Sequence, residues 1–319
     1  MNTYYILSPG NYHVISDYML RDLKKIKGVR YLYLRNTKVK IKNAIISQFY
    51  DKLTMKKHID LLVRKIIDEK KENKVVVFTN ESLVYLEKDY VVKLKEQGIR
   101  LVMVLIDPMS ATYDSVTKAK DVMEAVEFDQ VYTFNPLDSE KYGYAYCNAL
   151  YSDIVPADKR DTQFDFCYVG NVKNRLPLFK QIIEMFKKHE VKAFMKLSCF
   201  RPGIAKQIPK QYVGFMKVMD YEDVLTAVKE SNCIFDITQE GQSGVTLRYY
   251  EAVKYNKKLL TNNVNIKKLP FYDERYIKFY ETVEDIDWEW VKRRDEIDYG
   301  YADEYSPVNL LKRIEAGLK

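Results

Sequence analysis

The sequence of 319 residues contains only four cysteines and three histidines. The cysteines, at positions 147, 167, 199 and 233, are far apart and form no CxxC pair. This spacing gives no sign of a zinc site or of a disulfide framework. Three of them stand in apolar, strand-like runs, where a thiol behaves as a small buried hydrophobic group. We therefore expect no structural metal and no fold that depends on disulfides.

Long hydrophobic runs are also missing. No stretch of about 18 apolar residues is present, so the sequence predicts no membrane-spanning helix. The first residues, MNTYYILSPGNYH, have no basic flank and no long apolar core, and they do not resemble a signal peptide. Together these absences lead us to expect a cytoplasmic protein.

Negative charge is scarce in one region. The whole chain has a net charge of +7, whereas residues 1–60 alone carry twelve Lys and Arg against four Asp, a net charge of +8. Such a segment could contact an anionic membrane surface, or it could be an ordinary solvated face of a lysine-rich protein. No zinc finger, RRM signature or clear helix-turn-helix accompanies it, so we expect no nucleic-acid partner.

Apolar and amphipathic segments alternate along the entire chain. Short runs rich in Val, Ile, Tyr and Phe predict strands at 3–8, 29–35, 74–79, 100–107, 130–136, 165–170, 191–199, 211–217, 232–238, 257–263 and 276–281. Helical patterns occupy 14–26, 59–72, 83–98, 115–128, 176–189, 221–231, 246–256 and 307–319. Strands that are apolar throughout and alternate with helices are typical of doubly wound α/β domains with parallel sheets.

The chain is longer than a single hydrophobic core usually organises, and its two halves repeat the same pattern. A polar, proline-containing segment at 155–163 separates them. We therefore expect two Rossmann-like domains, 1–158 and 159–319, with a cleft between them. Ligands of such sheets bind beyond the carboxyl ends of the strands. The segments that follow predicted strands at this edge include 8–13, 79–82, 107–108, 170–175 and 239–246.

The segment GQSGVTLRYYEAVKYNKKLLTNN, residues 241–263, follows one of these strands. Gly241 and Gly244 would let a ligand approach the backbone, and the free N–H groups at a helix start favour a phosphate. Ser243 or Thr246 is the expected cap of this helix. No GKS or GKT follows, so the loop is not a Walker P-loop.

The two charged residues of this helix allow two interpretations. Arg248 in the first turn opposes the helix dipole, which makes more sense if a phosphate lies nearby. Glu251, three residues later on roughly the same face, could accept the hydroxyls of a ribose. The pair would then bind a nucleoside diphosphate. Alternatively, Arg248 and Glu251 form only an ion pair on the helix surface.

The run SGVTLRYYEAVKYNKKLLTNN resembles the donor-binding segment of GT-B glycosyltransferases, most closely those of capsular and lipopolysaccharide biosynthesis. The pattern of that segment is roughly SG-x-T-x-R-x-x-E-x-x-x-x-x-K-K-L-I-T-x-N. This chain has nearly every fixed position, including Ser243, Gly244, Thr246, Arg248 and Glu251. DFCYVGNVKNR and FDQVYTFNPLDSEKYGYAY resemble the start of the donor domain and the end of the acceptor domain in the same family.

The resemblance implies a GT-B fold, in which two Rossmann-like domains face a central cleft. It implies that Glu251 binds the donor ribose, and that Gly170, Asn171 and Arg175 face the diphosphate. Ser243, Gly244, Thr246 and Arg248 would complete the donor site. The last helix, 306–319, would pack back on the first domain. The family generally needs no bound divalent ion, so we expect no cofactor and no essential metal.

This chain departs from the family at one position. Retaining GT-B enzymes often carry two glutamates with seven residues between them, and Ser243 stands where the first would be. The stereochemistry of transfer therefore stays open.

An inverting transfer would need a base from the first domain. His13, in the loop after the first strand, and Asp107, at the end of the fourth, are the candidates. Each has a simpler alternative, a surface-loop histidine and a turn aspartate before Pro108.

From these observations we expect a glycosyltransferase that moves a sugar from a nucleotide-sugar donor to a glycan or lipid-linked glycan of the cell surface, in capsule, lipopolysaccharide or exopolysaccharide biosynthesis. The basic first domain would contact the inner face of the plasma membrane. Two other functions stay open: a nucleotide-sugar epimerase of the same fold, and a non-catalytic scaffold that binds nucleotide sugars.

Overall fold

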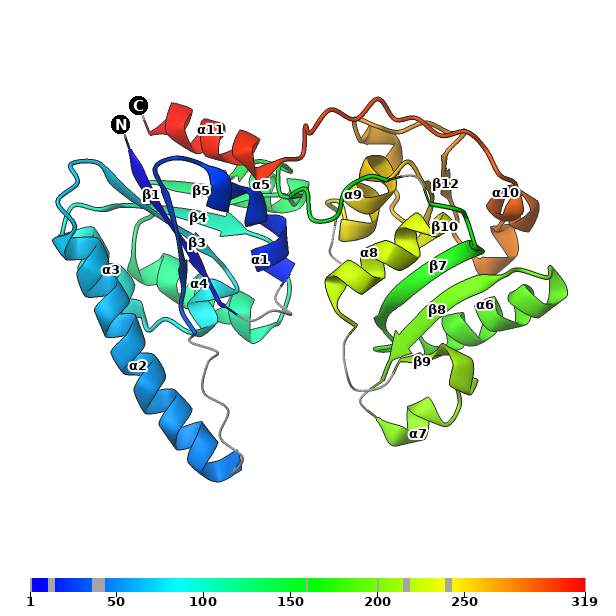
Figure 1. Cartoon of the computed structure of the whole chain (residues 1–319), viewed down its shortest axis with the longest axis horizontal. Coiled ribbons are helices and arrows are strands. Elements are labelled where there is room, and N and C mark those ends of the chain that lie inside the picture. The colour runs from blue at the N-terminus through cyan, green and yellow to red at the C-terminus, as the bar shows by residue number, and fades with distance from the viewer. Residues whose placement is uncertain are drawn as a thin grey trace. The chain divides into compact units, whose positions relative to one another are not determined.

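The chain forms two compact units, each built on one sheet. The computed structural model describes residues 2–10, 15–35, 44–158, 160–199, 201–214, 219–238 and 243–318, with side chains from residue 54 onward in the long helix that begins at 44. Unit 1 comprises Met1–Ile154 together with Glu304–Lys319, and unit 2 comprises Val155–Asp303. Each sheet has six strands, and the described strands pair in parallel throughout (Figure 1). This confirms the predicted α/β class with two Rossmann-like domains.

The sheet of unit 1 has the order β2-β1-β3-β4-β5-β6. Its strands are β1 (Thr3–Ser8), β2 (Val29–Tyr33), β3 (Lys74–Thr79), β4 (Arg100–Leu105), β5 (Gln130–Thr133) and β6 (Ala145–Tyr146). The helices are α1 (Ile15–Met19), α2 (Ala44–Asp68), α3 (Lys88–Glu96), α4 (Asp114–Ala125), α5 (Pro136–Tyr142) and α11 (Pro307–Gly317), with 3-10 turns η1 (Arg21–Lys25) and η2 (Ser82–Val84). The direction of winding changes between β1 and β3, where ligands of this fold class bind.

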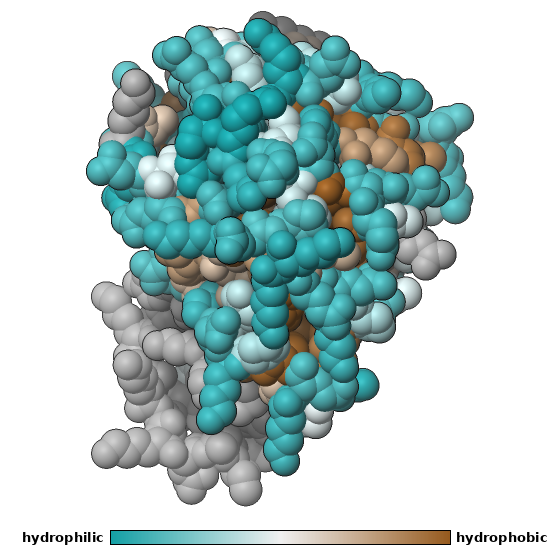
Figure 2. Space-filling model, turned by 90° about the vertical axis from the view of Figure 1, so that its right-hand side faces the viewer, coloured by the Kyte–Doolittle hydropathy of each residue, from teal (hydrophilic) through white to brown (hydrophobic). Residues whose placement is uncertain are grey.

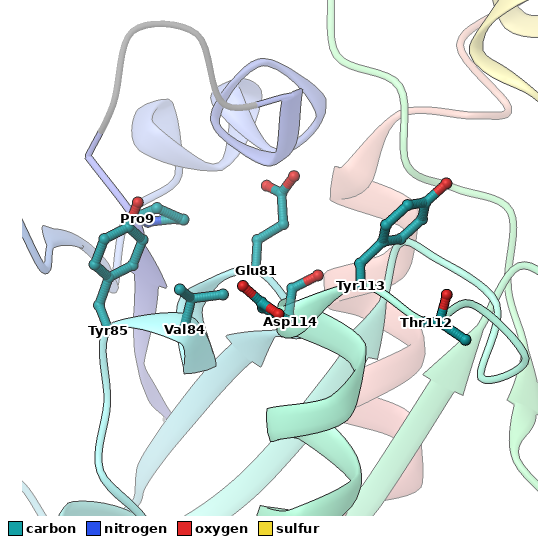
Figure 3. A pocket seen from close by; sticks show the side chains of 8 residues that line it. Pro9, Glu81, Val84, Tyr85, Thr112, Tyr113 and Asp114 are labelled. Carbon is teal, nitrogen blue, oxygen red and sulfur yellow. The ribbon is translucent and has the colours of Figure 1, made fainter. Parts of the chain in front are cut away.

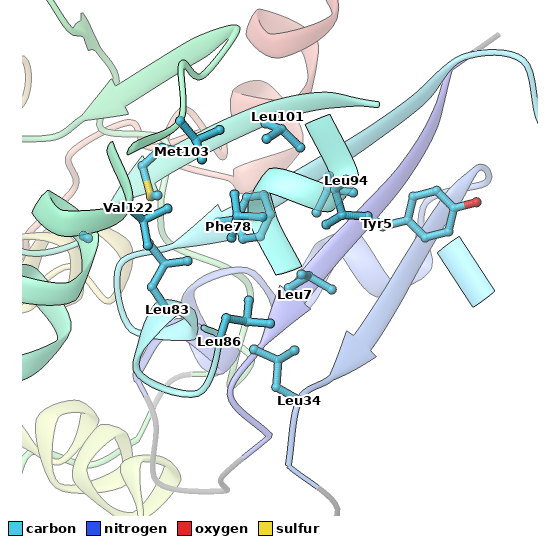
Figure 4. Close-up of a cluster of buried hydrophobic side chains, with 14 of the residues drawn as sticks. Tyr5, Leu7, Leu34, Phe78, Leu83, Leu86, Leu94, Leu101, Met103 and Val122 are labelled. Atoms are coloured by element: carbon cyan, nitrogen blue, oxygen red, sulfur yellow. The ribbon is translucent and has the colours of Figure 1, made fainter. Parts of the chain in front are cut away.

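Apolar side chains from the strands and helices form the core of unit 1 (Figure 4). Phe78 of β3 and Leu101 of β4 are fully buried there, as is Leu94 of α3. Strands that are buried on both faces require apolar residues throughout, which explains why β3 and β4 lack the alternation of a half-exposed strand.

Two predicted helices of unit 1 are interrupted. The helical pattern at 14–26 forms α1 and then η1, because Asp22 bonds to a distant loop: its Oδ2 accepts the N–H of Asp153 at 2.7 Å, and its N–H donates to Ser152 Oγ at 3.0 Å. The pattern at 83–98 forms η2 and then α3, because Glu87 is extended at φ −77° and ψ 147°. In contrast, α2 begins well before the predicted start at residue 59.

The sheet of unit 2 has the order β12-β11-β10-β7-β8-β9. Its strands are β7 (Phe164–Asn171), β8 (Ala193–Ser198), β9 (Val213–Gly214), β10 (Ser231–Asp236), β11 (Lys258–Thr261) and β12 (Ile277–Phe279). The helices are α6 (Leu176–Lys188), α7 (Pro202–Ala205), α8 (Tyr221–Lys229), α9 (Leu247–Lys254) and α10 (Trp288–Lys292), with 3-10 turns η3 (Lys210–Tyr212), η4 (Ile266–Lys268) and η5 (Val283–Asp285). Its core is rich in aromatic rings, with Phe166, Phe179 and Phe235 completely buried.

Hydrophilic residues cover most of the described surface on the face shown in Figure 2, with small hydrophobic areas between them. Within the described ranges, no helix combines the length and the apolar character that crossing a membrane requires.

The C-terminal helix α11 packs on unit 1, although unit 2 precedes it in the chain (Figure 1). Arg313 Nη1 donates to the carbonyl oxygen of Tyr146 at 3.1 Å, and Arg100 Nη1 donates to that of Leu318 at 2.7 Å. Leu310 and Ile314 are each 1% exposed. The sequence placed the domain boundary after residue 158, whereas unit 2 begins at Val155.

Because Ile314 is buried, Ile314→Ala should lower the stability of unit 1 by about 2–5 kcal/mol. Urea unfolding followed by far-ultraviolet circular dichroism would measure the loss. The exposed Glu315 of the same helix provides the control, and Glu315→Ala should change stability by less than about 0.5 kcal/mol. Equal effects of the two substitutions would show that α11 does not support unit 1.

Candidate functional site

The helix α9 is fixed to the carboxyl edge of the sheet in unit 2 by a buried carboxylate. Thr246 caps α9: its Oγ1 accepts the N–H of Arg248 at 3.2 Å and donates its own proton to Asp236 Oδ1 at 2.8 Å. Thr261, at the end of β11, donates to Asp236 Oδ2 at 2.7 Å. Burial raises the pKa of Asp236, and the hydrogen bonds from the two threonines oppose that rise.

Two asparagines after β11 hold the loop that leads into α9. Asn262 Oδ1 accepts the N–H of Thr238 at 2.7 Å, and Asn263 Nδ2 donates to the carbonyl oxygen of Gly244 at 3.3 Å. The TNN at the end of the predicted motif therefore has a structural role, because it ties both ends of the loop to the sheet. Gly241, at the centre of this loop, lies outside the described residues.

Arg248 and Glu251 form a buried ion pair. Arg248 Nη1 lies 2.7 Å from Oε1 and 2.5 Å from Oε2 of Glu251, whose side chain is completely buried. The Tyr221 hydroxyl also donates to Oε1, at 2.8 Å. Burial alone would lower the pKa of Arg248, but the charge and hydrogen bonds of Glu251 outweigh it and raise that pKa above its ordinary value. Arg248 and Glu251 therefore do form the ion pair that the sequence allowed, but the pair is buried and does not lie on the helix surface.

Arg248 also connects α9 to the first strand of unit 2. Its Nη2 donates to the carbonyl oxygen of Val169 in β7 at 2.6 Å. The motif at 243–251 and the segment 170–175 therefore meet at one edge of the sheet. This contact explains why an arginine can stand in the first turn of α9 despite the helix dipole.

The end of β7 and the turn that follows it contain the other predicted donor-site residues. A Cβ at Gly170 would lie 2.7 Å from the Tyr168 hydroxyl oxygen, so a side chain there would require the tyrosine ring to move. Arg175 stands at the start of α6, and its Nη2 donates to the carbonyl oxygen of Asn171 at 2.8 Å. The Arg175 Nε is buried and has no hydrogen-bond partner among the described residues. No side chain caps α6.

In unit 1, Asp107 follows β4, where the sequence placed a candidate base. Asn80, which follows β3 and is completely buried, donates from Nδ2 to Asp107 Oδ2 at 3.2 Å and accepts the N–H of Ile106 at 2.8 Å. Asn80 therefore joins the ends of two neighbouring strands. The other candidate base, His13, lies outside the described residues.

A cavity of about 530 Å³ lies beside this edge of unit 1. Its lining consists of Pro9, Glu81, Val84, Tyr85, Thr112, Tyr113, Asp114 and Ser115 (Figure 3). Burial raises the pKa of Glu81 to about 7, partly offset by hydrogen bonding from Ser16, while the negative charge of Asp107 adds to the rise. Glu81 was not predicted as a site residue, although its segment, 79–82, follows a strand at the expected edge.

Short-range hydrogen bonds hold Glu81 in place. Thr79 and Ser82 bond reciprocally on either side of it: Thr79 N–H donates to Ser82 Oγ at 3.1 Å, and Ser82 N–H donates to Thr79 Oγ1 at 3.2 Å. Ser82 Oγ also donates to the carbonyl oxygen of Thr79 at 2.7 Å. The turn is buried, so the backbone that carries Glu81 has a fixed conformation.

Within the described ranges, no three His, Cys, Asp or Glu side chains gather closely enough to hold a metal ion. The expectation that no metal is essential stays a prediction.

Comparisons with known proteins identify the fold. No protein-family model matches the sequence, and no curated protein matches it significantly. Among solved structures, the chain is similar over the full length of both proteins to an alpha-glucosyltransferase in complex with UDP-glucose and DNA containing an abasic site, with 13% identity and a TM-score of 0.60. An alpha-glucosyltransferase in complex with UDP and a DNA 13-mer with a central A:G mismatch gives 10% identity and a TM-score of 0.58, again with complete coverage of both chains. The chain thus has the GT-B fold that the motif implied.

The cap of α9 gives a first prediction for this site. Thr246→Ala removes the cap and one hydrogen bond to the buried Asp236, so unit 2 should lose about 1–3 kcal/mol of stability. Urea unfolding can be followed by tryptophan fluorescence, because the only two tryptophans, Trp288 and Trp290, lie in unit 2. Thr246→Ser keeps the hydroxyl and should retain most of the stability. A serine variant as unstable as the alanine variant would contradict the role of the hydroxyl.

The half-buried Glu81 gives a second prediction, on pH dependence. Its pKa is about 7 in the folded protein against an ordinary 4.5, so between these values the folded state binds more protons than the unfolded state. The contribution of Glu81 to stability therefore falls as pH rises through that window. Glu81→Gln removes this loss, so the variant should gain stability relative to the wild type at about pH 8 compared with about pH 4. Glu87→Gln, at an exposed position, is the control. If the difference in unfolding free energy between Glu81→Gln and the wild type is the same at both pH values, the prediction is contradicted.

Proposed function

We propose that this protein is a glycosyltransferase that moves a sugar from a nucleotide-sugar donor to a cell-surface glycan. The observation that carries the proposal is the contact between Arg248 and Val169. It joins the motif that resembles a donor-binding segment to the carboxyl end of β7, on a chain with the GT-B fold. Two parts of the sequence with independent resemblance to a donor site thus come together at the edge of the sheet where ligands bind.

The diphosphate of the donor would bind at the start of α6. The N-terminal N–H groups of this helix have no side-chain cap, and the buried Arg175 Nε has no partner among the described residues. Buried donors of this kind are costly unless a ligand or water satisfies them. Phosphate oxygens would satisfy both groups, and Gly170 would let them approach the backbone closely. Charge on the leaving diphosphate would then be stabilised without a metal ion.

The ribose would bind at Glu251, as the resemblance implies. In the structure both carboxylate oxygens are occupied, Oε1 by Tyr221 and Arg248, and Oε2 by Arg248. A ribose hydroxyl would take the place of the Tyr221 hydroxyl and leave the ion pair with Arg248 intact. On this view Arg248 positions Glu251, and its contribution to the diphosphate is secondary because its guanidinium already has two protein partners.

The acceptor would bind to unit 1, where Asp107 stays a candidate base and His13 is a candidate outside the described residues. The capsule, lipopolysaccharide or exopolysaccharide role rests on the resemblance of residues 243–263, and of the segments 128–146 and 165–175, to that family. Contact with the inner face of a membrane rests on the net charge of residues 1–60, of which 1, 11–14 and 36–43 lie outside the described ranges. The proteins of similar fold are in complex with DNA, so the expectation of no nucleic-acid partner also stays a prediction.

The two other functions from the sequence make different predictions. A nucleotide-sugar epimerase would convert the donor without any acceptor. A scaffold would bind the donor without turnover. No contact in the described residues favours either over transfer, and assays of donor conversion with and without an acceptor would separate the three functions.

Thermal stabilisation by UDP, GDP, CDP, CMP, ADP and dTDP tests the donor site. UDP is the first to try, because the solved structures of similar fold contain UDP or UDP-glucose. One nucleotide should raise the melting temperature, with or without EDTA, because a ligand that binds only the folded state stabilises it. Glu251→Gln should weaken the binding of that nucleotide by about tenfold or more, since a hydrogen bond to a charged group is lost. Tyr221→Phe should leave affinity equal or increased.

Glutamine is the appropriate substitution at position 251. Glutamine keeps an oxygen that can accept from Arg248, whereas Glu251→Ala would leave the guanidinium with neither charge nor acceptor at this position and would cost about 3–5 kcal/mol of stability. Because glutamine also removes the negative charge, urea unfolding of the variant accompanies the binding measurement. Glu184→Gln, at an exposed position of α6, is the control. If no nucleotide stabilises the protein, the donor site is wrong; if Tyr221→Phe weakens binding as much as Glu251→Gln, the ribose does not replace the tyrosine hydroxyl.

A further inference from the structure

The cavity of unit 1 combines groups that suit one class of ligand. Its carboxylates, Glu81 and Asp114, accept hydrogen bonds, and its tyrosines, Tyr85 and Tyr113, offer aromatic faces (Figure 3). Hydroxyl groups on a ring can donate to carboxylates while the C–H faces of the ring pack on tyrosine. The described lining contains no lysine, arginine or histidine. Among these described lining residues, a phosphate or a nucleic-acid backbone would meet negative charge and no cation.

The geometry of Glu81 leaves it able to accept a ligand. Its Oε2 lies 3.4 Å from the N–H of Ser16, which is at the limit of a hydrogen bond. A carboxylate has about four acceptor positions, so most of the capacity of Glu81 is left for a ligand. In Figure 3 the Glu81 side chain lies between Tyr85 and Pro9 on one side and Tyr113 on the other. The hydrogen bonds between Thr79 and Ser82 fix its backbone.

The second wall of the cavity is the start of α4. Asp114 is the first residue of this helix, and no side chain caps it. The Lys118 side chain, one turn further along, donates to the carbonyl oxygen of Val84 at 2.8 Å and so ties α4 to the turn that carries Glu81. Both walls are therefore held together by described contacts. The volume, about 530 Å³, is within the range of about 300–1,000 Å³ of small-molecule sites.

We propose that this cavity is the acceptor subsite and that it binds an uncharged sugar ring, with Glu81 and Asp114 accepting hydrogen bonds from the ring hydroxyls. The acceptor role of this cavity rests on the proposed function. The binding of a neutral sugar in unit 1 does not depend on the donor site. The cavity would then recognise the terminal, uncharged sugar of a glycan, and neither a lipid phosphate nor a nucleic acid.

Saturation-transfer NMR with the full chain tests the proposal without any donor. The probes are neutral methyl glycosides of glucose, galactose, mannose and N-acetylglucosamine, with glucose 6-phosphate and a short DNA oligonucleotide as anionic counterparts. At least one neutral glycoside should bind, with UDP absent or present. At about pH 8, above the pKa of Glu81, Glu81→Gln and Asp114→Asn should each weaken binding of the glycoside by about tenfold, because a hydrogen bond to a charged group is lost. Glu87→Gln, at the exposed residue that precedes α3, and Asp121→Asn, at an exposed position of α4, should leave glycoside binding unchanged.

Three results would overturn the proposal: no neutral glycoside binds under either condition, the bound glycoside is insensitive to both Glu81→Gln and Asp114→Asn, or an anionic probe binds more tightly than its neutral counterpart. Failure of the proposed function gives a different result. In that case no nucleotide stabilises the protein in the thermal experiment, whereas a glycoside whose binding depends on Glu81 would still support a sugar site in unit 1.

Discussion

The carboxyl edge of the sheet in unit 2 depends on the buried carboxylate of Asp236. A carboxylate in such a place is costly unless its oxygens accept hydrogen bonds. Here Thr246 satisfies one oxygen and Thr261 the other, and the backbone oxygen of Asp236 accepts the Tyr280 hydroxyl at 3.2 Å. The carboxylate thus links β10 and β11 to the start of α9. The positions of Arg248 and Glu251 follow from that link, because both lie within the first turns of α9.

In unit 1, different residues again place polar side chains at the carboxyl ends of the strands. Asn80 joins the ends of β3 and β4, and the Thr79–Ser82 turn presents Glu81 to a cavity. In both units the buried polar groups lie at the carboxyl ends of parallel strands, where the main-chain ladder ends and side chains must satisfy what remains. This common arrangement places ligand-binding chemistry and costly burial at the same edge, which is typical of functional sites.

Much of the fold was predictable from short stretches of sequence. Buried parallel strands need apolar residues at every position, so their runs stand out, and Thr246 is recognisable as a helix cap because a hydroxyl precedes an amphipathic pattern. The extent of α2 was missed, and so were the breaks after α1 and before α3. Those breaks come from contacts such as Asp22 with Ser152, whose partners are far apart in the sequence. For the candidate site, the sequence indicated the residues at 170–175 and 243–251, whereas Glu81 came to attention only in the structure.

The sequence by itself determined the α/β class, the two-domain organisation and the residues of the motif at 243–263, because each depends on neighbours within a few positions along the chain. Only the tertiary structure decided which of these residues meet. It buried Glu251 with Arg248 and Tyr221, joined Arg248 to β7, returned α11 to unit 1, and shifted the pKa of Glu81 by enclosing it near Asp107. Burial and the pairing of charges depend on groups that the fold brings together from distant positions, and local sequence patterns carry no record of them.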